Sequence, residues 1–471
     1  MKNCNSRLNK SLLAACSFLA LCGLLTGYQI YSSNSSSGGN RRTQSSTKKK
    51  FIEGRDLELG QVKDQTTKVI DEPSALFNDP AIKQAWGLKK SDAARAWSVS
   101  QGSRDVIVAV IDTGIDEFHE DLKSNLWTNP GESGLDAKGK NKASNGIDDD
   151  ANGFIDDVYG WNFVSNNNRL TDNHGHGTHI AGIIGAEAEN KKGISGISPK
   201  VSLMILKYFD PKVPNTDNLK NTVAAIHYAI KMGAHIINYS GGGTDFSQEE
   251  NDAVSLAAQK GILFVAAAGN ERSNSDQHHY YPADYKLKNI ISVTAIDPTT
   301  EVLASSNYGT ETVDIAAPGQ NILSCLPNNS YGLMTGTSQA TAFVSGAAAL
   351  VMSHKNQYFK AEDVKKYILA TGDTSQSLIS KTKTARQLNL YKSLTILSAE
   401  KAFSGADKSE IVKDSFYSDA KQNKRKTEDP NLNTTKNVAQ FGKNLLEAVS
   451  QPANRRNQPL RLGQEPKTPQ E

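Results

Sequence analysis

A serine, a histidine and an aspartate that are far apart in the chain have the side-chain types needed for nucleophilic catalysis. Ser338 lies in "GTSQAT", just before a long apolar run, where serine is also an ordinary helix cap. Its hydroxyl could attack an amide only if a base took its proton and a third group oriented that base. His176, within "HGHGTH", is a candidate base, and Asp112, which ends "VIVAVID", is a candidate orienting carboxylate.

The spacing of the histidines is also compatible with a metal-dependent reaction. His174, His176 and His179 form the pattern H-x-H-x-x-H, which metal-dependent hydrolases also use. No further Asp-His partner follows at the usual place of such a site, and the chain has only nine histidines. A metal-dependent hydrolase is therefore the weaker alternative, and it predicts indifference to the loss of Ser338.

The elements that would position these residues alternate along the chain between apolar runs and amphipathic helical runs. The expected strands are 105–112, 201–209, 235–240, 262–270, 290–297 and 313–319, and the expected helices include 218–233 and 247–261. Continuous apolar strands separated by helices predict an α/β fold with three layers, in which helices cover both faces of a mostly parallel central sheet. Catalytic groups of such sheets collect at the carboxyl ends of the strands, where Asp112 is expected.

The chain resembles the subtilisin-like serine peptidases, or subtilases, over about residues 80–395. "AVIDTGID", "HGTHIAG" and "GTSQAT" are similar to the aspartate, histidine and serine motifs of that family and follow its chain order. "AAAGN" and "YPADY" are similar to family segments between them. The resemblance implies a serine endopeptidase with Asp112, His176 and Ser338 as catalytic triad and Asn270 as oxyanion-hole donor.

The resemblance also implies a cleft that binds an extended peptide. "NYSGGG" and "AAAG" are similar to the two walls of the primary specificity pocket, so the expected substrate-binding residues are Ser240, Gly241, Gly242, Ala267 and Gly269. Pairing with a strand edge recognises the peptide backbone, so we expect unfolded or loop segments of proteins as substrates. The small walls, with Gly241 where the family often has leucine, predict a roomy pocket for a large uncharged side chain.

An acidic stretch, "NGIDDDANGFIDD", predicts a structural calcium site. Four oxygen-bearing side chains follow one another there much as at the start of an EF-hand loop: Asp148, Asp150, Asn152 and Asp156. The usual terminal glutamate is absent, and a solvated acidic turn is the alternative. By resemblance to the family, Asp121 and Asn190 form a weaker second calcium candidate.

The ends of the chain differ in composition from its middle. A basic start followed by "SLLAACSFLALCGLLTGY" is typical of an export signal, either cleaved or kept as a membrane anchor. We therefore expect a secreted, periplasmic or envelope-associated protein. The expected parts are a signal peptide or anchor at 1–31, a low-complexity linker or short propeptide at 32–78, the peptidase domain at 79–398, and a polar, largely disordered tail at 399–471.

The charge and the cysteine content of the chain limit the classes of partner and of stabilising bond that we expect. The 53 basic and 50 acidic residues nearly cancel, and no basic stripe with aromatic residues occurs, which argues against a nucleic-acid partner. Cys325 is the only cysteine after the N-terminal segment, so the main domain has no disulfide framework. We expect a monomer acting on protein substrates. The alternative is a non-catalytic peptide-binding protein on the same fold, which a missing triad or oxyanion residue would mark.

Overall fold

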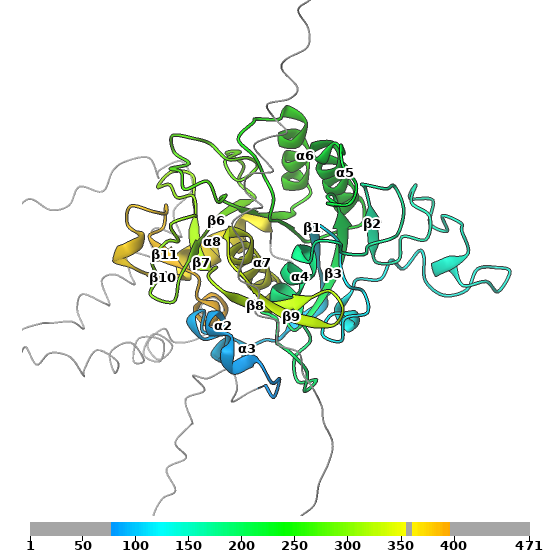
Figure 1. Ribbon diagram of the computed structural model, residues 1–471, viewed down its shortest axis with the longest axis horizontal. Coiled ribbons are helices and arrows are strands. Elements are labelled where there is room, and N and C mark those ends of the chain that lie inside the picture. The colour runs from blue at the N-terminus through cyan, green and yellow to red at the C-terminus, as the bar shows by residue number, and fades with distance from the viewer. Residues whose placement is uncertain (1–76, 355–359, 396–471) are drawn as a thin grey trace, which may run out of the picture. The chain divides into compact units, whose positions relative to one another are not determined.

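The computed structural model describes residues 77–354 and 360–395 (Figure 1). The expected signal segment, nearly all of the expected linker and the expected tail lie outside these residues. Within the two described ranges, no helix is both long and apolar enough to cross a membrane.

A nine-stranded sheet forms the centre of the described part. Its strands, in spatial order, are β10 (Asp373–Thr374), β11 (Arg386–Gln387), β7 (Ile315–Pro318), β6 (Ile290–Ile296), β5 (Leu263–Ala267), β4 (Ile236–Tyr239), β1 (Gly102–Asp112), β3 (Lys200–Lys207) and β2 (Gly160–Asn162). All neighbours are parallel except β10 and β11. The register pairs Asp112 with Lys207 and Ile111 with Tyr239, so the carboxyl ends of β1, β3 and β4 lie together.

Alternating side chains of the central strands are buried on opposite faces of the sheet. Val108 and Val110 of β1 belong to one hydrophobic core, together with side chains of α4 (His176–Gly185), α7 (Thr337–Ser353) and α8 (Ala361–Thr371). Ala109 and Ile111 belong to a second core with α5 (Asn218–Lys231) and α6 (Gln248–Gln259). In Figure 1, α5 and α6 accordingly lie together on one side, away from α4 and α7. This arrangement confirms the predicted three-layer α/β fold.

Helix α7 is the most enclosed of these helices, since every residue from Thr337 to Met352 is buried. A helix that is apolar on all sides belongs inside a protein, and the alanines, glycine and serines of α7 let it pass close to its neighbours. It packs against five strands of the sheet, β1, β4, β5, β6 and β7, and against α4. Ser338 is the second residue of this helix.

Shorter elements cover the edges of the domain. The hairpin of β8 (Ile322–Leu326) and β9 (Ser330–Met334) packs on α4, and α2 (Trp86–Lys90) and α3 (Ala93–Trp97) lie nearby in Figure 1. Short 3-10 turns occur at Ile82–Gln84, Lys123–Asn125, Lys142–Ser144 and Gln376–Leu378.

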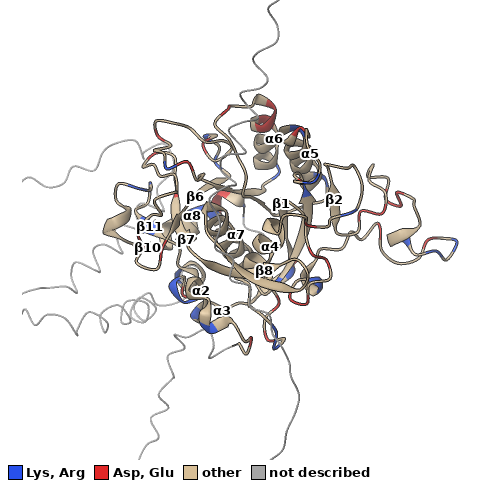
Figure 2. Cartoon of the chain, in the orientation of Figure 1, with Lys and Arg blue, Asp and Glu red and all other residues tan. Residues whose placement is uncertain are grey.

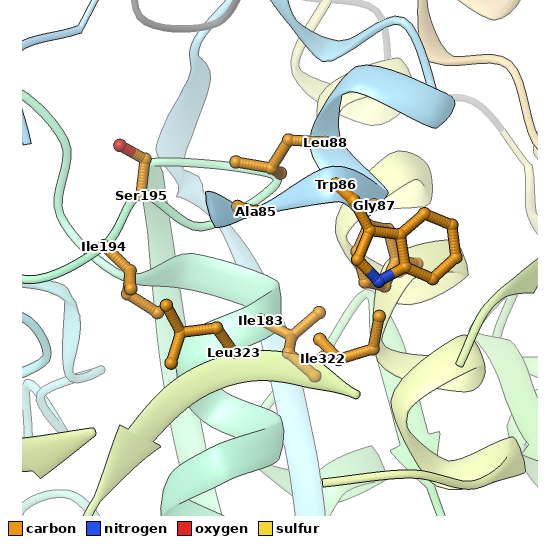
Figure 3. Close-up of a pocket in the computed structure, with 10 residues that line it drawn as sticks. Ala85, Trp86, Gly87, Leu88, Ile183, Ile194, Ser195, Ile322 and Leu323 are labelled. Atoms are coloured by element: carbon orange, nitrogen blue, oxygen red, sulfur yellow. The ribbon is translucent and has the colours of Figure 1, made fainter. Parts of the chain in front are cut away.

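A small apolar cavity lies between α2, α4 and β8 (Figure 3). Its volume is about 20 Å³, which is room for about one water molecule. Its lining includes Trp86, Ile183 and Ile322 and has no titratable side chain. We interpret it as a packing void of the core.

Candidate active site

The end of β1 meets the start of α4, and this junction brings Asp112 and His176 together. Asp112 is the last residue of β1 and His176 is the first residue of α4, preceded by Gly175 at a φ of 95°. Nδ1 of His176 donates to Oδ1 of Asp112 at 2.8 Å. The aspartate side chain is 5% exposed and the histidine side chain is 22% exposed. The carboxylate is therefore enclosed, while the ring stays accessible.

The same pair controls the protonation of the histidine. Burial alone would lower the pKa of His176, but the negative charge of Asp112 and its hydrogen bond outweigh this effect, and Asp172 adds to it. The net result is a raised pKa for His176. A base of raised pKa is a stronger proton acceptor once it is neutral.

Asp172, which the sequence analysis missed, joins β1 to α4. Its buried carboxylate accepts hydrogen bonds from Thr113 Oγ1 at 2.8 Å, from Gly175 N at 2.7 Å and from Thr178 N at 2.9 Å. Gly177 N donates in turn to Thr113 Oγ1 at 2.9 Å. Burial would raise the pKa of Asp172, but these hydrogen bonds hold it below its usual value. An ionised carboxylate thus caps α4 beside His176.

Ser338 lies at the start of α7 and faces the end of β4. Its Oγ donates to the carbonyl oxygen of Ser240 at 3.2 Å, and the residue is 7% exposed. None of the hydrogen bonds between described residues joins Ser338 to His176. The structure therefore pairs Asp112 with His176, and Ser338 with one of the expected wall residues.

Asn270 is held at the same helix end. Its Oδ1 accepts from the backbone N of Thr337 at 3.0 Å and from Thr337 Oγ1 at 3.2 Å. Because Thr337 directly precedes Ser338, this contact places the amide of Asn270 next to the start of α7. Because the amide oxygen of Asn270 accepts hydrogen bonds from Thr337, its Nδ2 group is the part that can donate a hydrogen bond to a substrate.

The three histidines do not form a metal site together. His179 is fully buried, and its Nε2 donates to the carbonyls of Ile322 at 3.0 Å and Gly332 at 3.2 Å. Burial lowers the pKa of His179 to about 3, so it stays neutral. Among the described residues, the ring of His174 pairs with the ring of His176, with centroids 6.1 Å apart. Across residues 77–354 and 360–395, the side chains grouped closely enough to hold a metal include no histidine.

The expected pocket walls follow two neighbouring strands. Ser240, Gly241 and Gly242 come after β4, and Ala267 and Gly269 lie at and after the end of β5, which pairs with β4. The carboxyl ends of these strands therefore bring the two wall segments to the same edge of the sheet.

Gly241 has close aromatic neighbours, and its effect on the width of the pocket stays a prediction. A Cβ added at Gly241 would lie 2.5 Å from the hydroxyl oxygen of Tyr208 and 3.0 Å from the ring of Tyr239. The two tyrosine rings have centroids 5.5 Å apart, so a larger residue at position 241 would require the hydroxyl of Tyr208 to shift. Sequence analysis missed Tyr208 because it follows a different strand, β3.

The predicted acidic loop lies between β1 and β2, where Figure 2 shows several acidic residues along the chain. Asp148 and Asp150 come together there with Glu132, each with one carboxylate oxygen within 4.8 Å of the others. Glu132 is fully buried, and its Oε2 has no hydrogen-bond partner. Burial, reinforced by the neighbouring carboxylates, raises the pKa of Glu132.

The other two residues of the predicted loop have different partners. Asn152 Nδ2 donates to Asp157 Oδ2 at 2.9 Å, and the carboxylate of Asp156 accepts from Gly146 N at 3.1 Å. Glu132 was missed because it precedes the quoted stretch and carries no spacing signal.

The second calcium candidate is arranged differently. Asn190 presents its Nδ2 to Asp121 at 2.8 Å, and Ile194 N and Tyr331 OH each donate to the other oxygen of Asp121 at 2.9 Å. The amide oxygen of Asn190 accepts from Lys192 N at 2.8 Å. Protein donors bond to these oxygens, and the second calcium candidate stays a prediction.

Comparison with known proteins identifies the family. Residues 103–394 match the sequence profile described as "Subtilase family", which is more than half of the 471 residues. The chain therefore belongs to the subtilase family, and by class it is a serine endopeptidase. The resemblance inferred from the three motifs is confirmed.

Three relatives illustrate the similarity. "Major intracellular serine protease" of Bacillus subtilis (strain 168) is 35% identical over 276 residues, covering 58% of this chain and 76% of that relative. "Thermitase" of Thermoactinomyces vulgaris is 33% identical over 299 residues, covering 63% and 91%. "Subtilisin-like protease 1" of Plasmodium berghei (strain Anka) is 33% identical over 298 residues, covering 59% and 48%, so this chain spans under half of that relative.

Proposed function

We propose that this protein is an exported, calcium-stabilised serine endopeptidase whose triad is Asp112, His176 and Ser338. The observation that carries the proposal is the 2.8 Å hydrogen bond from His176 Nδ1 to Asp112 Oδ1. This bond fixes the ring tautomer in which Nε2 is unprotonated and able to accept a proton. Asp112 then stabilises the positive charge that His176 acquires.

The reaction begins when Ser338 Oγ leaves the carbonyl of Ser240 and turns toward His176. The hydroxyl attacks the scissile carbonyl carbon while its proton passes to Nε2 of His176. His176 then returns this proton to the leaving amine. Water repeats the same steps on the acyl-enzyme and releases the second product.

Two donors would hold the oxyanion of the tetrahedral intermediate. They are Nδ2 of Asn270 and the backbone N–H of Ser338, which lies at the positive end of the long helix α7. The anchoring of Asn270 Oδ1 by Thr337 supports this role, because it fixes the amide before substrate arrives. In subtilisin itself, loss of the side-chain donor costs about 100- to 1,000-fold in rate.

The substrate in this proposal is an extended segment of a protein that pairs with the backbone at Ser240–Gly242. All four catalytic groups come from a single chain, which supports action as a monomer. The basic and apolar N-terminal sequence supports export, cleaved or anchored, although one relative is named as intracellular.

Calcium would bind at Glu132, Asp148 and Asp150. Carboxylate oxygens are the ligands that calcium prefers. The buried Oε2 of Glu132 has no hydrogen-bond partner, which supports a bound cation at this position. A divalent cation there would offset the repulsion among the three carboxylates and hold the loop between β1 and β2.

Labelling with a fluorophosphonate probe tests the catalytic proposal. The purified full chain in calcium-containing buffer should react, Ser338→Ala should not, and Ser353→Ala, at the other end of α7, should react as the wild type does. Labelling of folded Ser338→Ala, or none of folded wild type, would contradict the proposal. The second result would favour a non-catalytic peptide-binding protein.

A further inference from the structure

The ring of Tyr280 lies between the two segments that form the walls of the primary pocket. A Cβ added at Gly242 would clash with Cε1 of this ring, and a Cβ added at Gly269 would lie 3.0 Å from its Cδ2. Cε1 and Cδ2 are opposite corners of a tyrosine ring. The ring therefore bridges the gap from one wall to the other.

The backbone around Tyr280 is fixed on both sides. The next residue, Tyr281, exchanges two hydrogen bonds with Gly243, with N to O distances of 2.7 and 2.9 Å. Tyr280 N itself donates to Asp284 Oδ2 at 2.8 Å. These bonds attach Tyr280 to the wall that contains Gly242, so the ring is a built part of this region.

Polar side chains surround the ring of Tyr280. Burial, followed by the negative charge of Glu271, raises the pKa of Tyr280, so its hydroxyl stays protonated. Glu271 Oε2 accepts from Asn307 Nδ2 at 2.7 Å and lies against Gly269. At the neighbouring Gly241, an added Cβ would lie 2.5 Å from the hydroxyl oxygen of Tyr208, so a second tyrosine lies at this wall.

We propose that Tyr280 restricts this peptidase to substrates with a small uncharged residue, such as glycine, alanine or serine, immediately before the scissile bond. This inference rests on the proposed function and replaces the expected preference for a large side chain. An aromatic ring already between the walls excludes a second one, whereas a methyl group extends little beyond the backbone. Mismatches of single methylene groups in such pockets change kcat/KM by about 10- to 200-fold.

The test compares peptide anilides that are identical except for alanine, leucine or phenylalanine before the cleaved bond. For the full-length wild type, kcat/KM should be at least about tenfold higher with alanine than with phenylalanine. Tyr280→Gly should raise kcat/KM for the phenylalanine peptide by about 10- to 100-fold and reverse the order. Tyr280→Phe keeps the ring and should keep the preference for alanine.

A wild type that prefers phenylalanine, or an order that Tyr280→Gly leaves unchanged, would overturn the role of Tyr280. Fluorophosphonate labelling of each variant shows separately whether Ser338 is still active. If the folded wild type neither reacts with the probe nor cleaves any peptide, the proposed function fails as well. The comparison of the three peptides with the wild type does not depend on the folding of any variant. If Tyr280→Gly does not fold, Tyr280→Ala can take its place in the test.

Discussion

At the scale of single residues, the hydrogen bond between Asp112 and His176 decides both rate and pH dependence. Asp112→Asn should lower kcat by about four orders of magnitude, as the same change does in other serine peptidases, because asparagine holds the wrong histidine tautomer. The base works only when it is neutral, so activity rises as pH rises through the pKa of His176. In the wild type this midpoint of kcat/KM should lie above 6.5, the ordinary histidine value.

The residual activity of Asp112→Asn should have its midpoint at lower pH, because burial then acts on His176 with less opposing charge. Profiles of kcat/KM against pH measure this shift. Asp116→Asn is the matched control, since Asp116 accepts from Phe118 N and makes no hydrogen bond to the ring. An unchanged midpoint in Asp112→Asn would contradict the assignment.

At the scale of elements, the loop between β1 and β2 should depend on calcium through Glu132. Adding calcium should raise the melting temperature of the wild type, because an ion at 100 times its Kd adds about 2.7 kcal/mol to the free energy of unfolding. Glu132→Gln should lose most of this gain, since it removes one of three carboxylates. Asp156→Asn should keep it, because Asp156 bonds elsewhere in the loop.

Thermal melting with calcium and with a chelator, on all three proteins, measures the effect. Equal stabilisation of the wild type and Glu132→Gln would place the ion elsewhere. Calcium stabilises the fold and takes no part in the proposed reaction. A variant that remains folded should therefore still react with the fluorophosphonate probe.

At the scale of the whole molecule, the sequence predicted strands and helices correctly where the spacing of its apolar residues matches the repeat of those elements. The apolar run at 105–112 became the end of β1, and the helix expected at 218–233 is α5, Asn218–Lys231. The family motifs pointed to Asp112 and His176, which the fold brings into contact.

The residues that sequence reasoning missed act through contacts between distant segments. Glu132 meets an acidic stretch that follows it, Asp172 closes on Thr113, and Tyr280 reaches between two glycines of other segments. None belongs to a periodic run, and only the packing of parallel strands brings these groups together. The small wall residues suggested a roomy pocket because the ring that approaches Gly242 and Gly269 belongs to another segment.

The carboxylate of Asp172 has a consequence for the stability of the protein in acid. Its pKa is depressed, so the stability that it contributes is complete above its unfolded pKa of about 4 and is lost only as pH falls through the lower folded value. His176, with its raised pKa, is already protonated and inactive at about pH 5. Between these limits His176 should be inactive while the hydrogen bonds of the Asp172 carboxylate are still intact. Copies stored at pH 5 should escape digestion by one another and recover full peptide cleavage on return to neutral pH. Fragments would show that the peptidase is still active at pH 5. A lasting loss of activity without fragments would show that acid damages the fold.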